Sequence, residues 1–184
     1  LMILSTLVAS LVIGQSSPAI VCTVNPGHDA DLELSLEYAG VKNYFCCEDC
    51  VPKFKAEPAK YLKGAADLKA PVGEFLFDPI SGKRIKSDKA RGTVDYKGVR
   101  YFFASKDNMD AFNKDPKKFS AIPAKESLVC PVMKETIETY SKADSYVDYK
   151  DVRYYICCAG CIKPMKTDPA KYAKNVTPTA PKVH

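Results

Sequence analysis

Apolar and polar residues alternate at three places in the chain, each time in two short runs separated by a tight turn. The runs lie at residues 32–37 and 41–46, 92–96 and 99–103, and 145–149 and 152–157. A period of two is typical of half-buried β-strands. Turn residues between the runs, such as Lys97-Gly98, favour hairpins. The pattern therefore predicts three β-hairpins.

The residues after each hairpin follow one spacing. A reference position is followed four residues later by a large apolar residue, then by a proline after four more and an aromatic after three more. These positions are Cys50, Phe54, Pro58 and Tyr61; Asn108, Phe112, Pro116 and Phe119; and Cys161, Met165, Pro169 and Tyr172. The same spacing in three segments indicates an internal repeat.

Each repeat is expected to contain a short helix after its hairpin. In the middle repeat, Ser105 is a suitable N-cap for a helix at 106–113. In the third repeat, Pro164 lies farther inside the helix than Pro52 does in the first, so we expect that helix to begin late or to be distorted.

The fold class expected is α+β, with three tandem small units. Each unit would contain a β-hairpin and a short strand, followed by a knuckle and a short helix; in the first repeat the short strand is expected at 21–24. The predicted boundaries are 1–19 for a secretory signal peptide, 20–63, 74–121 and 127–175 for the first, middle and third repeats, and 176–184 for a loose tail.

The first 13 residues are almost entirely apolar, and Ser17-Pro18-Ala19 offers small residues for cleavage. About 13 apolar residues are too few for a membrane span but suit a secretory signal. A membrane anchor and a buried strand remain alternatives. The favoured interpretation is a periplasmic or secreted protein whose mature form does not span the membrane.

Composition and charge exclude several functions. The 184 residues carry a net charge of +5, mainly from scattered lysines without a basic block, so a nucleic-acid partner is not expected. The sequence has no phosphate loop, no supported Ser/His/Asp set and no recognisable carboxylate pair. These absences favour a binding protein over an enzyme.

The eight cysteines fall into two groups of four, which indicates two local sites of one kind. They are Cys22, Cys46, Cys47 and Cys50 in the first repeat, and Cys130, Cys157, Cys158 and Cys161 in the third. Within each knuckle, spacings of three and four place sulfurs on one side of a turn that leads into a helix N-terminus. Free N–H groups there favour thiolates, which bind Zn(II) or Cu(I). We therefore expect one such ion per cysteine-containing repeat.

Two other uses of the cysteines remain open. An oxidising compartment would favour structural disulfides in an extracellular interaction module. Redox exchange through Cys47-x-x-Cys50 or Cys158-x-x-Cys161 would make the chain a thiol–disulfide exchange protein.

Other soft or borderline ligands are less favoured. Met133 and Met165 lie near the third group and would suit Cu(I), although Met165 also occupies the core position of Phe54. His28 and His184 are expected to be solvated.

The middle repeat lacks sulfur at the equivalent positions. Asp78 and Ser81 stand where the third repeat has Cys130 and Met133, and Ala104 and Asn108 stand where knuckle cysteines occur. The middle repeat is therefore expected to act as a spacer or packing unit.

With these residues aligned, residues 20–174 resemble the YHS-domain family and the related TRASH-type metal-coordinating modules. The resemblance rests on an Asp-Pro or Cys-Pro-Val-Met opening, a Tyr-x-Gly hairpin and an aromatic–cysteine knuckle. These correspond to Asp78-Pro79-Ile80-Ser81-Gly82, Cys130-Pro131-Val132-Met133, Tyr96-Lys97-Gly98, Tyr44-Phe45-Cys46-Cys47-Glu48-Asp49-Cys50 and Tyr155-Ile156-Cys157-Cys158-Ala159-Gly160-Cys161.

The resemblance implies small α+β metal-binding units, as found in heavy-metal sensors and in copper and zinc efflux systems, so a metal-transport or efflux protein is a candidate partner. The first-choice ligands that it implies are Cys22, Cys46, Cys50, Cys130, Cys157 and Cys161. Cys47 and Cys158 are added from their spacing alone.

Overall fold

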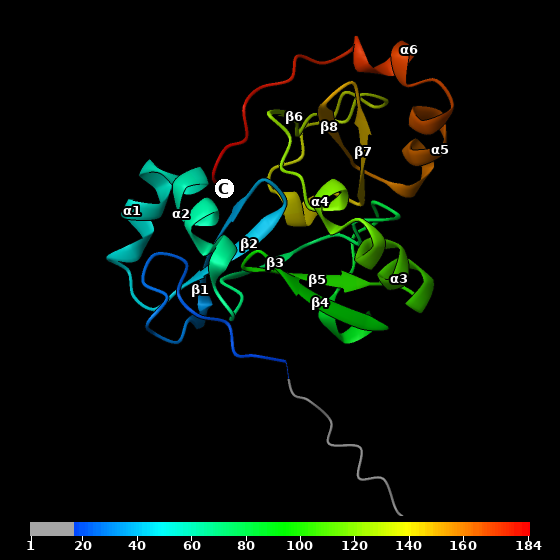
Figure 1. Ribbon diagram of the computed structural model, residues 1–184. Coiled ribbons are helices and arrows are strands. Elements are labelled where there is room, and N and C mark those ends of the chain that lie inside the picture. The colour runs from blue at the N-terminus through cyan, green and yellow to red at the C-terminus, as the bar shows by residue number, and fades with distance from the viewer. Residues whose placement is uncertain (1–16) are drawn as a thin grey trace, which may run out of the picture.

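The computed structural model describes residues 17–184, which form an α+β fold with two sheets and several short helices (Figure 1). The larger sheet has the strand order β1-β2-β3-β5-β4. Its strands are β1 (Asp31–Tyr38), β2 (Val41–Phe45), β3 (Gly73–Phe75), β4 (Gly92–Tyr96) and β5 (Val99–Phe103). β3 pairs antiparallel with β2 and parallel with β5. Strands from the first and middle repeats therefore form one continuous sheet.

The smaller sheet has the order β6-β8-β7. Its strands are β6 (Lys125–Ser127), β7 (Ser145–Tyr149) and β8 (Val152–Ile156). β6 runs parallel to β8, and β7 is antiparallel to it. Strands β3, β5 and β4 of the larger sheet have this same arrangement.

All three predicted hairpins are present, and their turns explain why they form. Both central residues have positive φ in each turn: Ala39 and Gly40, Lys97 and Gly98, Lys150 and Asp151. Positive φ at both positions defines the type I′ turn, whose twist matches that of two paired strands. The third turn adopts this conformation without a glycine.

Short helices follow each hairpin. They are α1 (Cys50–Ala56), α2 (Pro58–Gly64), α3 (Lys106–Lys114), α4 (Pro116–Phe119), α5 (Ala159–Thr167) and α6 (Pro169–Ala173). Three 3-10 turns, η1 (Ala65–Asp67), η2 (Ser87–Lys89) and η3 (Tyr140–Lys142), complete the described elements. The repeated proline thus begins a second helix, where its missing N–H costs nothing.

Two helix predictions have different outcomes. Ser105 caps α3 as expected, because its hydroxyl accepts a hydrogen bond from the Asn108 N–H at 3.1 Å. Of the two alternatives predicted for the third repeat's helix, the late start is wrong and the distortion stays a prediction. α5 begins at Ala159 and contains Pro164 within it.

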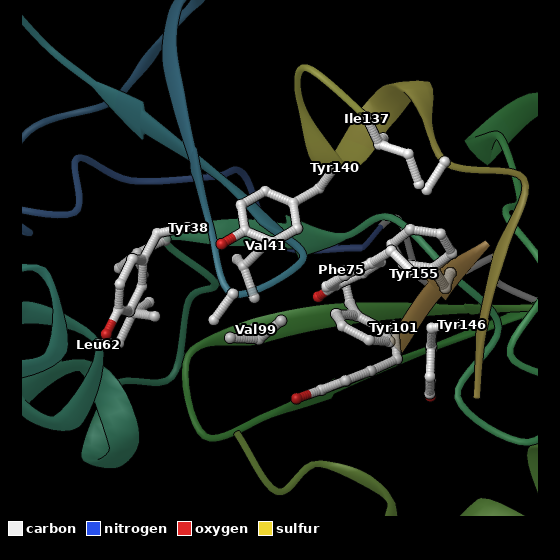
Figure 2. Packing of buried hydrophobic residues seen from close by; sticks show 14 of the residues in the cluster. Tyr38, Val41, Leu62, Phe75, Val99, Tyr101, Ile137, Tyr140, Tyr146 and Tyr155 are labelled. Carbon is white, nitrogen blue, oxygen red and sulfur yellow. The ribbon is translucent and has the colours of Figure 1, made fainter. Parts of the chain in front are cut away.

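The hydrophobic core joins both sheets (Figure 2). Phe54, Phe112 and Met165 are completely buried, so Met165 fills a core position as expected. Where the sheets meet, Phe75 packs against Tyr146 and Phe77 packs against Tyr155, with ring centroids 6.0 and 5.7 Å apart.

The expectation of a loose tail is wrong. Thr179 and Glu126 exchange two backbone hydrogen bonds of 2.8 and 2.9 Å, and His184 and Glu37 exchange two of 2.8 Å. β1 and β6 are edge strands, whose free N–H and C=O groups need partners. The tail supplies them and runs from the smaller sheet to the larger one (Figure 1).

The N-terminal predictions are only partly covered by the structure. The predicted strand at 21–24 is wrong, since Val21 forms a single β-bridge to Asp29. Most of the predicted signal peptide, residues 1–16, lies outside the described residues. Across 17–184, no helix combines the length and apolar character needed to cross a membrane.

Candidate metal centres

Three sulfurs from separate parts of the first repeat meet in one cluster. Cys22 precedes β1, Cys46 directly follows β2, and Cys50 begins α1. The Cys50 Sγ lies 3.7 Å from the Cys22 Sγ and 3.8 Å from the Cys46 Sγ. Cys22 and Cys50 are buried and Cys46 is half-buried. We call this cluster the first triad.

The third repeat builds the same cluster. Cys130 precedes its hairpin, Cys157 directly follows β8, and Cys161 lies in the first turn of α5. In each triad, all three sulfurs lie within 4.8 Å of one another. Cys130 and Cys161 are buried and Cys157 is half-buried, as at the equivalent positions of the first triad. We call this cluster the second triad.

The sulfur separations suit a common ion. Four ligands about 2.3 Å from a tetrahedral ion lie about 3.8 Å from one another. Three of the six separations within the triads are 3.7, 3.8 and 4.0 Å, and the other three are within 4.8 Å. All eight cysteines are free thiols. Each triad can therefore hold a thiophilic metal ion with little rearrangement.

Cys47 and Cys158 lie beside the triads rather than within them. Both are exposed. The Cys47 Sγ is 3.5 Å from the Cys50 Sγ and 3.9 Å from the Cys46 Sγ, and the Cys158 Sγ is 3.3 Å from the Cys161 Sγ. Cys47 is therefore close to two sulfurs of the first triad, but neither Cys47 nor Cys158 belongs to the cluster that contains the deep sulfur of Cys22 or Cys130. The structure thus gathers six of the eight predicted ligands and leaves two on the solvent side.

Backbone N–H groups surround the innermost sulfur of each triad. The Asn25 N–H donates to the Cys22 Sγ at 3.3 Å. Burial acts to raise the pKa of Cys22, but N–H donors from Cys46, Asn25 and Val24 together outweigh it, so this pKa is lowered. In the second triad, burial likewise acts to raise the pKa of Cys130, and the corresponding donors lower it. Each site therefore favours negative charge on its deepest sulfur.

The cysteines that lie in the helices, Cys50 and Cys161, have a raised pKa instead. Burial, followed by hydrogen bonding to neighbouring thiols, raises the pKa of Cys50. Burial and the hydrogen bond with Cys158 raise the pKa of Cys161 to about 12. Both thiols are protonated near neutral pH without an ion, so binding of a metal would release protons.

The middle repeat keeps the N–H groups and replaces the sulfur by a carboxylate. Asp78 is buried, and its Oδ1 accepts hydrogen bonds from the Ile80 and Ser81 N–H groups at 2.9 and 3.2 Å. Its Oδ2 accepts from the Ala104 N–H at 2.9 Å and from the Asn108 Nδ2 at 2.6 Å. When the repeats are aligned, these donors occupy the positions of Val24, Asn25, Cys46 and Cys50 around Cys22.

The remaining candidates lie outside the triads. Met165 is completely buried and Met133 is largely exposed. His28 is exposed, and the exposed His184 places its ring edge against Tyr140 at 5.3 Å.

Residues 17–184 thus define an α+β protein with two cysteine clusters capable of binding metal. Comparison with known protein families gives a match for one part of the chain: residues 76–121 match the YHS domain. Neither the curated proteins nor the solved structures gave a match.

The YHS match falls on the repeat that contains no cysteine. That repeat carries the Asp78-Pro79 opening and the Tyr96-Lys97-Gly98 hairpin. Sequence reasoning placed Asp78 and Asn108 in the ligand positions but missed the hydrogen bond that joins them. The pairing of a carboxylate with an amide at two ligand positions could have indicated it.

Proposed function

We propose that the chain is an exported heavy-metal-binding protein built from three tandem YHS-like units, of which the first and third each hold one Zn(II) or Cu(I). The deepest ligands would be Cys22 and Cys130, completed by Cys46 and Cys50 and by Cys157 and Cys161. Its role would be sequestration, delivery or sensing in the periplasm or outside the cell, with a metal-transport or efflux protein as partner. It would act as a binding protein and not as an enzyme.

One observation supports this proposal most strongly. The same three-sulfur cluster occurs twice, 108 positions apart at Cys22 and Cys130. Each time, backbone N–H groups converge on the sulfur that is farthest from solvent. A buried thiolate needs a compensating positive charge, and a thiophilic cation meets this need for all three sulfurs at once.

Cys47 and Cys158 would have a secondary role in this proposal. Each is exposed and contacts a triad thiol. An exposed sulfur can complete a tetrahedral ion or be the first to contact an incoming ligand, whereas the buried sulfurs cannot.

The short contacts of Cys47 and Cys158 also support a second candidate function, thiol–disulfide exchange. The Cys47–Cys50 and Cys158–Cys161 sulfurs are 3.5 and 3.3 Å apart. Hydrogen bonding to Cys50 lowers the pKa of the exposed Cys47, as expected of an attacking thiol.

Metal content and intact mass of full-length protein, purified anaerobically with and without reductant, separate these functions. The metal proposal predicts two equivalents of metal and eight alkylatable thiols after chelation. Structural disulfides predict no metal and a mass lower by two hydrogens per bridge. An exchange protein predicts one reducible pair per site with a high potential. Either of the last two results would overturn the metal proposal.

A further inference from the structure

A cavity of about 320 Å³ lies where the three repeats meet, away from both triads. Tyr38 and Leu62 come from the first repeat, Val99 and Tyr101 from the middle repeat, and Arg153 from the third. Figure 2 shows Tyr38 and Leu62 across from Val99, with Tyr101 beyond. Its volume lies within the range of small-molecule sites and leaves room for about ten heavy atoms.

The lining combines an apolar wall with positive charge. Most of the lining side chains are aliphatic or aromatic. The charged residues among them are Lys63, Lys97 and Arg153, and no aspartate or glutamate of the described chain lines the cavity. Lys63 and Lys97 are exposed at its rim, whereas Arg153 is 4% exposed. Such a lining fits an organic anion with an apolar body.

Arg153 has hydrogen-bonding capacity left over. Its Nε and Nη2 donate to Asp148 at 2.8 and 2.9 Å, and its guanidinium lies 4.0 Å from the Tyr146 ring centroid. No hydrogen bond to another described residue is made by this guanidinium. A guanidinium has five N–H donors, so one with a single hydrogen-bonding partner can accommodate a second anion. The other carboxyl group that acts on the Arg153 charge is that of its strand neighbour Glu126, which does not line the cavity.

The middle repeat contains an internal comparison. Arg100 occupies the equivalent strand position and pairs with Asp95 through the same two nitrogens. The Arg100 Nη2 also donates to the Pro18 carbonyl at 2.7 Å. Arg153 has no counterpart to this third bond and lines the cavity instead.

We propose that this cavity binds a small amphipathic monoanion, a carboxylate carrying an aliphatic or aromatic body of about eight carbons. The carboxylate would face Arg153 and the rim lysines, and the apolar body would pack among Tyr38, Leu62 and Val99. No cysteine lines the cavity, so this site is independent of the metal proposal.

Calorimetric titration of the full-length protein with octanoate tests the proposal, with octanol and octyltrimethylammonium as neutral and cationic probes. Octanoate should bind saturably at one equivalent, and the other two should bind at least tenfold more weakly. No saturable binding of octanoate, or equal binding of the three probes, would overturn the proposal.

Two kinds of variant locate the binding. Ala66→Phe places a ring in the cavity and should abolish octanoate binding. Lys63→Glu with Lys97→Glu reverses the rim charge and should weaken it at least tenfold. Lys114→Glu with Lys174→Glu makes the same change in net charge at exposed positions that do not line the cavity. This control should change the affinity for octanoate less than twofold. Unchanged binding in the rim variant would refute the site, and metal content should stay constant throughout.

Discussion

The Asn108 amide donates a 2.6 Å hydrogen bond to the Asp78 carboxylate at the place where Cys50 and Cys22 lie 3.7 Å apart in the first repeat. The middle repeat therefore holds its opening loop to its helix by a hydrogen bond, where the other repeats have sulfurs that an ion can join. The loop backbone is similar in both cases, because N–H groups at corresponding positions point to the deepest side chain.

This hydrogen-bond network makes Asp78 a strong determinant of stability. Asp78→Ala would leave four donors without a partner in a buried site, and we expect a loss of about 3–5 kcal/mol in the free energy of unfolding. Urea denaturation of the full-length protein measures this. Asp88→Ala, at an exposed position, should change stability by less than about 0.5 kcal/mol. A loss below about 1 kcal/mol for Asp78→Ala would show that the network is dispensable.

The same N–H groups should accept sulfur again. We expect the triple variant Asp78→Cys, Ala104→Cys and Asn108→Cys to gain one equivalent of metal over the unmodified chain, measured by elemental analysis after anaerobic purification. Asp78→Cys alone is the control and should gain none, because a single thiolate makes a weak site. If the triple variant folds, as judged by circular dichroism, and still binds no extra metal, then the middle repeat differs from the others in more than its ligands.

Burial distinguishes the triad sulfurs from their exposed neighbours. Cys22→Ser and Cys130→Ser should each remove one equivalent of metal, because a hydroxyl is a poor soft ligand in the buried position. Cys47→Ser and Cys158→Ser should keep two equivalents and lower the affinity by about 10–100-fold, as loss of a supporting contact does. A full equivalent lost in Cys47→Ser would make Cys47 an essential ligand and contradict the triad geometry.

Glu126 should give stability a pH dependence of its own. Burial, partly offset by the hydrogen bond from the Tyr140 hydroxyl, raises its pKa to about 7. The unfolded value is about 4.3. Because the folded value is higher, the stabilising contribution is complete below about pH 4.3 and is lost as pH rises to about 7.

The matched comparison is Glu126→Gln, which cannot ionise. The unfolding free energy of the unmodified chain, relative to this variant, should fall by about 3 kcal/mol between pH 4.3 and 7. Denaturation across this pH range measures the difference, in which the contributions of other titrating groups cancel. Parallel curves for the two proteins would mean that folding leaves the pKa of Glu126 unchanged.

Local patterns predicted the hairpins and the knuckle, because alternation, turn residues and cysteine spacing act over a few residues. The shared sheet could not be predicted in this way, since β3 contains only three residues and its partners β2 and β5 lie far along the chain. The docked tail was missed for a similar reason. The tail is held to Glu37 and Glu126 by backbone hydrogen bonds, which produce no periodic pattern of side chains in the sequence.

The spacing of the cysteines predicted which of them form the candidate sites, but not which of their side chains are buried. The spacing of Cys46, Cys47 and Cys50 cannot tell which sulfur turns inward, because residues three and four positions before a helix residue both lie near it. The approach of Cys22 decides this, and that approach depends on long-range pairing such as the hydrogen bond from the Thr23 N–H to the Tyr44 carbonyl.

The pairing of β3 with β2 has a consequence for how such a chain can change over generations. A related chain without the first repeat would expose the edge of β3 that pairs with β2 here. An exposed strand edge can pair with strands of other molecules. The first repeat therefore shields the second from aggregation, which gives selection a reason to retain it that does not depend on its cysteines.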